Sequence, residues 1–150
     1  MVLKSSSEKE TKFFAASLAE KIISAPHKKA GAFVIKLNGD LGAGKTTFTQ
    51  GFAKTLGITR RITSPTFVIM KRHITKHGGY KNLYHIDAYR MKQIKDMNPL
   101  GFIEIIKNPN NIILIEWAEN IKNPLLRGAA SVTFSYGKKE SDRSLRVSGV

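Results

Sequence analysis

The glycine-rich stretch from Gly39 to Thr46 restricts the fold of this chain more than any other feature. It reads Gly39-Asp-Leu-Gly-Ala-Gly-Lys45-Thr46, which is a glycine, four residues, a second glycine, a lysine and a threonine. A short, mostly apolar run precedes it at residues 32–37, and residues 46–56 are spaced like a helix that Gly57 can end. A strand, a glycine-rich loop and a helix in this order predict a P-loop, in which backbone N–H groups surround a phosphate.

The residue types in this loop suit a nucleotide bound with magnesium. Glycines let the backbone wrap a phosphate without obstruction by side chains, and the helix start after Gly44 directs unpaired N–H groups at it. Lys45 adds a positive charge for the outer phosphates, and the Thr46 hydroxyl can be a ligand of Mg²⁺. The alternative is an ordinary glycine-rich turn, which the flanking strand and helix disfavour.

Two acids are placed to take part in phosphoryl transfer, which needs a carboxylate to organise magnesium and a group to orient the attacking oxygen. Glu116 follows the apolar run Ile112–Ile115, as a Walker-B acid follows a buried strand whose carboxyl end faces the ligand. Asp87 ends another expected strand and would reach the same site if that strand neighbours the loop. The alternatives are a solvated carboxylate at Glu116, and a helix cap or a pair with Arg90 at Asp87.

Three further positions are candidates for roles near the nucleotide. The hydroxyls of Ser64-Pro-Thr66 can sense a γ-phosphate, as switch threonines do, although the same residues also fit a proline turn. His85 alternates with Asp87 along a strand, so both residues share a face, where His85 is either a metal ligand or a structural, hydrogen-bonded histidine. Trp117 follows Glu116 directly and is expected in the core or in the wall of the nucleotide cleft.

The charge of the chain favours a polyanion as partner or substrate. There are 25 Lys and Arg against 11 Asp and Glu, a formal net charge of +14. No acid occurs between Asp40 and Asp87, whereas eight basic residues fall in the segment 45–81. This segment is therefore a candidate contact for tRNA or an acidic partner, and the alternative is a solvated face in a chain that is basic throughout.

Hydrophobic periodicity outside the loop predicts a mixed sheet. The expected elements are a helix over 7–24 with a capping box at its start, a hairpin of strands at 66–70 and 80–86, a helical stretch over 91–107 interrupted near 98–99, a buried parallel strand at 112–115 and a closing hairpin at 130–136 and 145–147. A length of 150 residues with 41% hydrophobic side chains fits one domain over 1–150.

Other classes of protein are disfavoured by what the sequence lacks. Zero cysteines exclude disulfide scaffolds, thiol catalysis and thiolate metal sites. No apolar run approaches the roughly 18 residues of a spanning helix, and the N-terminus has no signal-peptide pattern, so we expect a cytoplasmic protein without a membrane partner. No Asn-Lys-x-Asp sequence occurs to recognise guanine, which argues against a GTPase.

Several segments together resemble the TsaE family, also called YjeE, the bacterial ATPases of tRNA threonylcarbamoyladenosine synthesis. The segments that carry the resemblance appear in the family's order between residues 10 and 117. They are Glu10-Thr11, Gly39 to Phe48, Ser64-Pro-Thr-Phe67, His85-Ile-Asp-Ala-Tyr-Arg90, Leu100-Gly-Phe-Ile-Glu104 and Ile115-Glu-Trp117. Each short motif is weak alone, but their order behind a P-loop in 150 residues is highly specific.

The resemblance implies a fold, a reaction and partners. The fold is α/β, a P-loop NTPase-like three-layer arrangement with a mixed, largely parallel central sheet and antiparallel hairpin additions. The implied reaction is magnesium-dependent hydrolysis of ATP in complex with TsaD and TsaB, of which TsaD transfers the threonylcarbamoyl group to tRNA.

The resemblance also implies roles for particular residues. Lys45 and the backbone from Leu41 to Thr47 would contact phosphates, Thr46 and Glu116 would bind Mg²⁺, and Asp87 and Thr66 would act in catalysis or switching. Thr11 would lie near the base. The expected nucleotide site thus comprises Thr11, Gly39, Asp40, Leu41, Gly42, Ala43, Gly44, Lys45, Thr46, Thr47 and Trp117, with Lys45, Thr66, Asp87 and Glu116 catalytic and Thr46, Asp87 and Glu116 at the metal.

Two other functions stay open from the sequence. A small-molecule kinase shares the P-loop but normally needs an acceptor pocket and an arginine-bearing lid, which have no evident place in 150 residues. A nucleotide-gated RNA-binding or scaffold module with little turnover is favoured by the lack of an obvious water-orienting glutamine.

Overall fold

The computed structural model describes residues 1–25, 30–76, 79–121, 123–139 and 141–150. The elements follow each other as β1 (Val2–Ser5), α1 (Glu8–Ser24), β2 (Phe33–Asn38), α2 (Lys45–Thr55), β3 (Met70–Ile74), β4 (Asn82–Asp87), the 3₁₀ helix η1 (Ile94–Leu100), α3 (Phe102–Lys107), β5 (Asn111–Glu116), the short 3₁₀ helices η2 (Ala118–Asn120) and η3 (Pro124–Leu126), β6 (Ala130–Tyr136) and β7 (Arg143–Ser148).

One seven-stranded sheet carries the described strands, in the order β1-β7-β6-β2-β5-β4-β3. The four central strands β6, β2, β5 and β4 are parallel to one another. The remaining pairs, β3 with β4, β6 with β7 and β7 with β1, are antiparallel. The expected mixed, largely parallel sheet with antiparallel hairpin additions is therefore confirmed.

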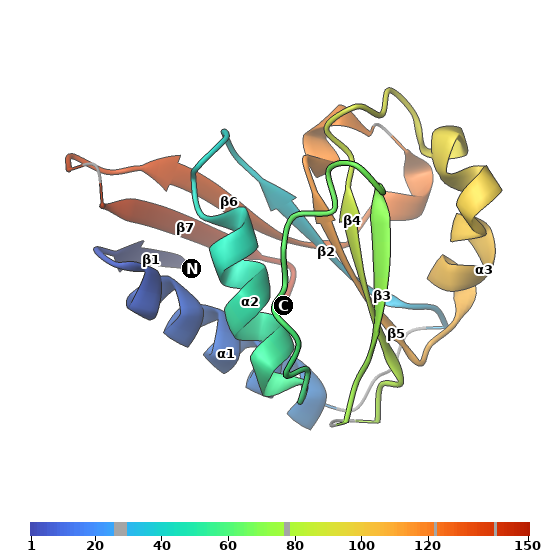
Figure 1. Cartoon of the computed structure of the whole chain (residues 1–150), viewed down its shortest axis with the longest axis horizontal. Helices are drawn as coiled ribbons and strands as arrows, with labels where there is room; N and C mark the ends of the chain where they lie inside the picture. Colours follow the sequence, from blue (N-terminus) through green and yellow to red (C-terminus); the bar gives the residue numbers. More distant parts are fainter. Residues whose placement is uncertain (26–29, 77–78, 122, 140) are drawn as a thin grey trace.

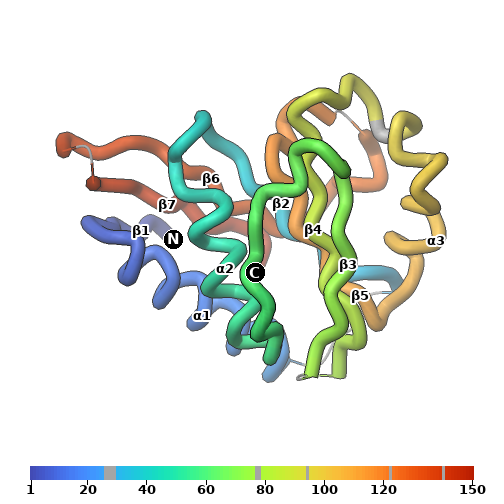
Figure 2. The backbone as a smooth tube through the Cα atoms, in the orientation of Figure 1, coloured from blue at the N-terminus to red at the C-terminus, as the bar shows by residue number. Residues whose placement is uncertain are grey.

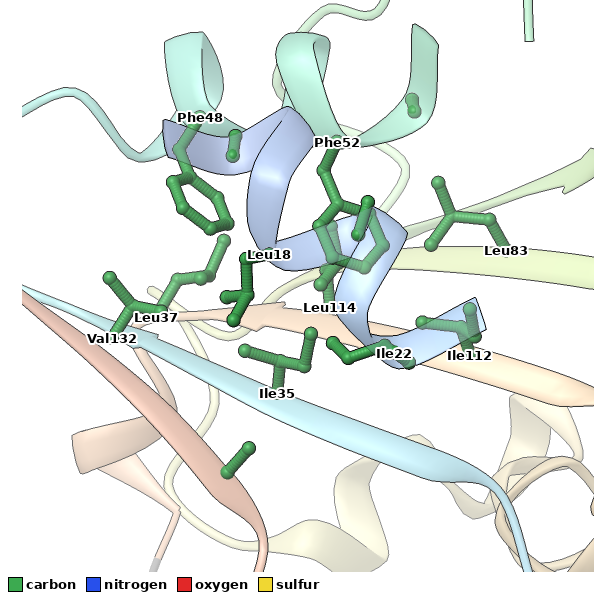
Figure 3. Packing of buried hydrophobic residues seen from close by; sticks show 14 of the residues in the cluster. Leu18, Ile22, Ile35, Leu37, Phe48, Phe52, Leu83, Ile112, Leu114 and Val132 are labelled. Atoms are coloured by element: carbon green, nitrogen blue, oxygen red, sulfur yellow. The ribbon is translucent and has the colours of Figure 1, made fainter. Parts of the chain in front are cut away.

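Alternating side chains of the central strands divide the core into two layers. Ile112 and Leu114 of β5 face α1 and α2, whereas Ile113 and Ile115 face the side that carries η1 and α3. Figure 1 shows α1 and α2 together over one part of the sheet and α3 at its other end. Figure 3 shows the first layer closely, with Phe48 and Phe52 of α2 above the strands. Each such buried side chain contributes roughly 1.5–3 kcal/mol of transfer free energy.

Helix α1 is held close to α2 and therefore close to the glycine-rich loop. The Ser7 hydroxyl caps α1 by accepting from the N–H of Glu10 at 3.2 Å, and the Glu10 carboxylate accepts from the N–H of Ser6 at 2.7 Å. At Gly51 of α2, a Cβ atom would lie 2.5 Å from the carbonyl oxygen of Lys12. Only glycine allows this approach, which brings the second turn of α1 against the middle of α2.

The expected strand at 66–70 is wrong. Residues 66–69 form a turn in which the N–H groups of Val68 and Ile69 both donate to the carbonyl of Pro65, at 3.1 and 2.6 Å, and β3 begins only at Met70. Ile69 has a φ of 66°, which a β-branched residue rarely adopts. The hairpin itself is present as β3 and β4, and residue 78 of its expected turn lies outside the described residues.

Three other boundaries differ from expectation. The break in the 91–107 helical stretch falls at Gly101, with a φ of 73°, and Pro99 lies inside η1. β4 begins at Asn82, two residues after the expected start. The edge strand β1 has no counterpart among the expected elements.

No helix in the described part of the chain is long and apolar enough to cross a membrane.

Candidate functional site

The candidate site lies at the carboxyl ends of three parallel strands. Leu37 of β2 and Asp87 of β4 both stand in register with Glu116 at the end of β5. The glycine-rich loop follows β2, and α2 begins at Lys45. Figure 2 shows the segment between α2 and β3 returning to this same end of the sheet. Carboxyl ends of parallel strands are where ligands bind in sheets of this kind.

Backbone conformations that favour glycine shape the loop at 39–46. Gly39 has a φ of 135°, and a Cβ there would lie 2.6 Å from the carbonyl oxygen of Phe134 in β6. Gly42 and Gly44 also have positive φ, of 74° and 105°. The ring of Phe134 packs edge-on against Phe48 of α2, with centroids 5.6 Å apart. The loop is thus fixed between β6 and the start of α2.

Lys45 is buried with its ammonium group inside the loop. Its Nζ donates to the carbonyls of Gly39 at 2.5 Å and Asp40 at 2.8 Å, and lies 3.9 Å from the ring centroid of Trp117. Burial lowers the pKa of Lys45, while the carboxylates of the site, Glu116 foremost, oppose that shift. The loop therefore holds a cation with three donors where phosphate oxygens would approach.

Glu116 is the centre of a buried polar contact. Its Oε1 accepts from the Thr46 hydroxyl at 3.3 Å and lies 2.8 Å from Nε2 of His85. A carboxylate only accepts, so Nε2 is the protonated nitrogen in this contact. His85 Nδ1 is buried and has no hydrogen-bond partner among the described residues. His85 thus orients Glu116 toward Thr46. This contact matches the structural, hydrogen-bonded histidine, one of the two alternatives that the sequence left open for His85.

Asp87 accepts hydrogen bonds from two hydroxyls of the loop that precedes β3. Its Oδ2 accepts from Ser64 at 3.1 Å and from Thr66 at 2.9 Å, and these two hydroxyls lie 2.9 Å from each other. Its Oδ1 accepts from the N–H of Tyr89 at 2.9 Å, which is local capping after the strand. The pair with Arg90 considered from the sequence does not occur among the described residues, because Arg90 instead lies over the ring of Phe67.

These residues line one cavity of about 390 Å³. Its walls are Glu8, Leu41, Gly42, Gly44, Lys45, Thr46, Thr47, Ser64, Thr66, Asp87, Glu116 and Trp117. A second cavity of about 630 Å³ shares Glu8, Gly42, Gly44 and Thr47 with it and extends past Thr11 to Arg143. The first cavity has the charge and the donors for phosphates, and the second has room for a nucleoside beside them.

Thr11 and Trp117 occupy different positions around the two cavities. Thr11 is buried, and its hydroxyl lies 2.8 Å from that of Ser5. Thr11 lines the second cavity, but little of its side chain is exposed there. Trp117 has a φ of 59° and contacts Tyr89 edge-on, with ring centroids 5.0 Å apart. Its ring forms a wall of the first cavity.

The donor set fits magnesium better than a soft metal. Thr46 and Glu116 present oxygen atoms 3.3 Å apart beside Lys45, and Asp87 adds a neighbouring carboxylate. No group of three or more His, Cys, Asp or Glu side chains able to hold a metal occurs in the described residues. Mg²⁺ keeps several waters and is commonly held by one or two protein ligands plus substrate phosphates, so this set suffices for it.

The structure adds residues to the site that the sequence did not indicate. The Glu119 carboxylate accepts from the N–H of Gly39 at 3.1 Å, although 80 residues separate them. Arg143 donates to the carbonyl of Gly42 at 3.2 Å, and the Tyr136 hydroxyl donates to the carbonyl of Leu41. Chain order carries no signal for these contacts, because each depends on how β6, β7 and η2 pack around the loop.

Comparison with known proteins finds a matching family model and similar sequences. The family model described as "Threonylcarbamoyl adenosine biosynthesis protein TsaE" matches residues 5–145. A tRNA threonylcarbamoyladenosine biosynthesis protein TsaE from Bacillus subtilis is 48% identical over 92 residues, which cover 61% of this chain and 54% of that protein. The TsaE of Rickettsia typhi is 42% identical over 120 residues, covering 79% of this chain and 75% of the relative. The alignment with the Bacillus relative thus spans about half of its length.

A solved structure shares the fold. The crystal structure of Bacillus subtilis YdiB superposes with a TM-score of 0.68 at 30% sequence identity, covering 98% of this chain and 83% of that chain.

Proposed function

We propose, from the premise that this chain belongs to the TsaE family of tRNA threonylcarbamoyladenosine biosynthesis proteins, that it binds ATP with Mg²⁺ and hydrolyses it to ADP and phosphate. The observation that carries the proposal is the convergence of Lys45, the Thr46–Glu116 pair and Asp87 on a single cavity. A cation, a hard-metal ligand pair and a carboxylate with two hydroxyls are the parts that hydrolysis of a nucleotide requires.

The residues would divide the reaction between them. Lys45 and the backbone N–H groups of the loop neutralise the outer phosphates, and Thr46 with Glu116 holds the metal. A magnesium ion held there would supply positive charge to offset the negative charge that builds up on the leaving group. Asp87, with the hydroxyls of Ser64 and Thr66 on its Oδ2, orients the attacking water and accepts its proton.

Partners and location form part of the same proposal. We infer activity in complex with TsaD and TsaB from the resemblance to the TsaE family, and a tRNA-modifying role favours the cytoplasm. Contact with tRNA through the basic segment 45–81 is supported by eight Lys and Arg without an intervening acid.

Measuring phosphate release with and without TsaD and TsaB tests the proposal. We expect slow release by the chain alone and faster release with both partners, and Lys45→Ala should abolish both. A phosphorylated metabolite as product would support the small-molecule kinase instead. ATP binding without phosphate release under any condition would support the scaffold module.

The choice of nucleotide is tested separately by thermal unfolding. We expect Mg²⁺ and ATP to raise the melting temperature more than equal GTP, because a tighter ligand stabilises the folded state more at the same concentration. Equal shifts would contradict the adenine preference.

A further inference from the structure

Two side chains at the end of the β6–β7 hairpin contact the glycine-rich loop at 39–46. Tyr136 and Arg143 are directly opposite each other in the register of these strands, and the Arg143 guanidinium lies 4.9 Å from the centroid of the Tyr136 ring. The Tyr136 hydroxyl donates to the carbonyl of Leu41, and Arg143 donates to the carbonyl of Gly42 at 3.2 Å. We call this pair of side chains the hairpin clamp. The clamp holds two consecutive carbonyls of the loop.

The core of the protein determines where the clamp stands. Val132, Phe134 and Tyr136 alternate along β6 and therefore share one face of the sheet. Val132 and Phe134 are buried in the layer under α1 and α2, whereas Tyr136 is exposed. The N–H of Gly137 donates to the carbonyl of Asp142 at 2.9 Å, which closes the end of the hairpin. A buried row of side chains and a closed hairpin thus place the clamp beside the loop.

The direction of the two held carbonyls determines the direction of the N–H groups that follow them. The peptide bonds of the described residues are trans, and in a trans peptide the C=O of one residue points opposite to the N–H of the next. With the carbonyls of Leu41 and Gly42 turned toward the hairpin, the N–H groups of Gly42 and Ala43 are turned away from it. The clamp therefore keeps the negative ends of two peptide dipoles away from the side of the loop on which N–H groups would meet a phosphate.

The first two carbonyls of the loop are held in a different way. Gly39 and Asp40 accept from Lys45 Nζ, at 2.5 and 2.8 Å. A phosphate that binds this ammonium competes with both carbonyls for the same N–H donors. The donors to Leu41 and Gly42 come from the hairpin instead. The clamp can therefore hold the second half of the loop while Lys45 exchanges the first half for phosphate.

We infer that the hairpin clamp positions the glycine-rich loop for the phosphates of the nucleotide. The inference rests on the proposed function, because the loop needs this positioning only if phosphates bind there. Tyr136 and Arg143 are positioning residues, since they act through the carbonyls of Leu41 and Gly42. A loop that is already ordered loses less conformational entropy when a phosphate binds, so the clamp contributes to affinity.

The expected kinetic signature follows from this role. The loop contacts the phosphates before and during hydrolysis, so the clamp stabilises the bound substrate and the transition state alike. Loss of such uniform binding raises KM and leaves kcat nearly unchanged.

A direct contact with the nucleoside is the alternative role for Arg143, because Arg143 also lines the second cavity of about 630 Å³. Inorganic triphosphate separates the two roles, since it offers the phosphates without ribose or base. If the clamp acts through the loop, its loss lowers the affinity for ATP and for inorganic triphosphate by the same factor. If Arg143 contacts the nucleoside, only the affinity for ATP falls.

The test measures the Kd of ATP and of inorganic triphosphate with Mg²⁺ by isothermal titration calorimetry, and phosphate release from ATP. Tyr136→Phe removes the hydroxyl and keeps the ring, and Arg143→Met removes the guanidinium and keeps an unbranched side chain. We expect Tyr136→Phe to weaken both ligands about threefold to tenfold, the effect of one lost hydrogen bond. Arg143→Met should weaken both ligands at least as much. In both variants KM should rise and kcat should stay within about twofold.

Two controls separate positioning from overall charge and from folding. Arg146→Met removes the same charge from an exposed residue of the same strand, so it should leave both Kd values unchanged. The melting temperature without ligand should be nearly the same in Tyr136→Phe, Arg143→Met and the unaltered chain. A clamp variant that melts much earlier than the unaltered chain would show that the contacts stabilise the fold, which contradicts the inference.

Four further outcomes would overturn the inference while the proposed function stands. Both clamp variants could bind the two ligands as tightly as the unaltered chain does. The loss could be confined to ATP, which would assign Arg143 to the nucleoside. Arg146→Met could weaken binding as much as Arg143→Met, which would reduce the effect to overall charge. Finally, kcat could fall with KM unchanged. If the unaltered chain binds neither ATP nor inorganic triphosphate, the proposed function itself fails.

Discussion

Two loops meet at the nucleotide cavity, and they are held in different ways. The glycine loop (39–46) is fixed by backbone geometry, with positive φ at three glycines and a close approach of Gly39 to the carbonyl of Phe134. The hydroxyl loop (62–69) is fixed by side chains, through Ser64 and Thr66 on Asp87. The first loop is therefore formed by folding alone, whereas the contacts of the second can be exchanged for contacts with a ligand.

This difference separates binding from turnover. A backbone cradle that needs no rearrangement contributes to affinity, because little ordering accompanies binding. Hydroxyls that can turn from a carboxylate to a phosphate or a water respond to what occupies the cavity. Changes in the glycine loop should therefore affect binding first, and changes in the hydroxyl loop should affect the rate of hydrolysis first.

Lys45→Ala should have the largest effect. It removes the cation that contacts the outer phosphates, so triphosphate binding should weaken and hydrolysis should fall by about 10²–10³-fold or more. Phosphate release and ATP titration measure both quantities. Lys54→Ala, which changes an exposed lysine of the same helix, is the matched control. Normal turnover by Lys45→Ala would contradict the assignment of residues 39–46 as a phosphate-binding P-loop.

Glu116→Gln should have the second-largest effect, because Glu116 is one of the proposed ligands of the metal. The amide keeps the shape of the side chain but not its charge, so nucleotide binding should remain while magnesium-dependent hydrolysis falls by about 10²-fold. The measurement is a magnesium titration of the rate beside Asp87→Asn. Normal hydrolysis by Glu116→Gln together with an inactive Asp87→Asn would reverse our ranking of the two acids.

Gly39→Ala tests whether the glycine loop depends on backbone geometry. The added Cβ would combine a φ of 135° with a contact of 2.6 Å, so the melting temperature should fall by several degrees and ATP should bind more weakly. Gly79→Ala isolates the conformational strain, since φ there is 74° and no atom described by the structure lies within 4 Å of the added Cβ. Equal effects of the two variants would show that the contact with Phe134 is unimportant.

Thr66→Val tests the opposite expectation for the hydroxyl loop. The valine keeps the shape of the threonine and removes one of two hydroxyls on Asp87, so the rate should fall by about tenfold with little change in ATP affinity. Ser64→Ala should behave in the same way. A large drop in affinity with an unchanged rate would contradict the division between the two loops.

The smallest effect should be a pH dependence of folding stability that comes from His73. This histidine lies near Lys71, which donates a hydrogen bond to Thr63 of the hydroxyl loop. The pKa of His73 is lowered in the folded chain, so below the ordinary value near 6.5 the unfolded chain binds more protons. Stability should therefore fall as the pH drops from about 7.5 toward 5.5, by no more than about 2–4 °C in melting temperature. His73→Gln should remove this part of the dependence, and an identical pH profile in the variant would assign it to other groups.

The glycine loop and the central strands could be predicted because their signals are local. Four consecutive apolar residues, Ile112–Ile115, suffice for a buried parallel strand, and glycine and lysine spacing suffices for the loop. The resulting fold is confirmed. The site residues stay predictions, although the structure brings the predicted side chains into or beside one pair of cavities.

The conformation of residues 66–69 in the hydroxyl loop could not be predicted for the opposite reason, although Ser64 and Thr66 were expected near the nucleotide. Thr66-Phe-Val-Ile-Met70 has the composition of a strand, but Pro65 accepts two turn hydrogen bonds and Asp87, distant in sequence, holds Thr66. Strand β1 escaped prediction because four residues at an edge carry almost no periodic signal, and its pairing with β7 is a tertiary contact. Alternation did place His85 on the face of Asp87, but its bond to Glu116 depends on the neighbouring strand.

The position of Trp117 gives this protein a built-in optical probe. It is the only tryptophan in the sequence, and the Lys45 ammonium lies 3.9 Å from its ring centroid. A phosphate that draws the ammonium away removes a positive charge from the face of the indole, which changes the field that its excited state experiences. Intrinsic emission, excited at wavelengths that tyrosine hardly absorbs, should therefore follow the arrival and departure of nucleotide in real time, without a label.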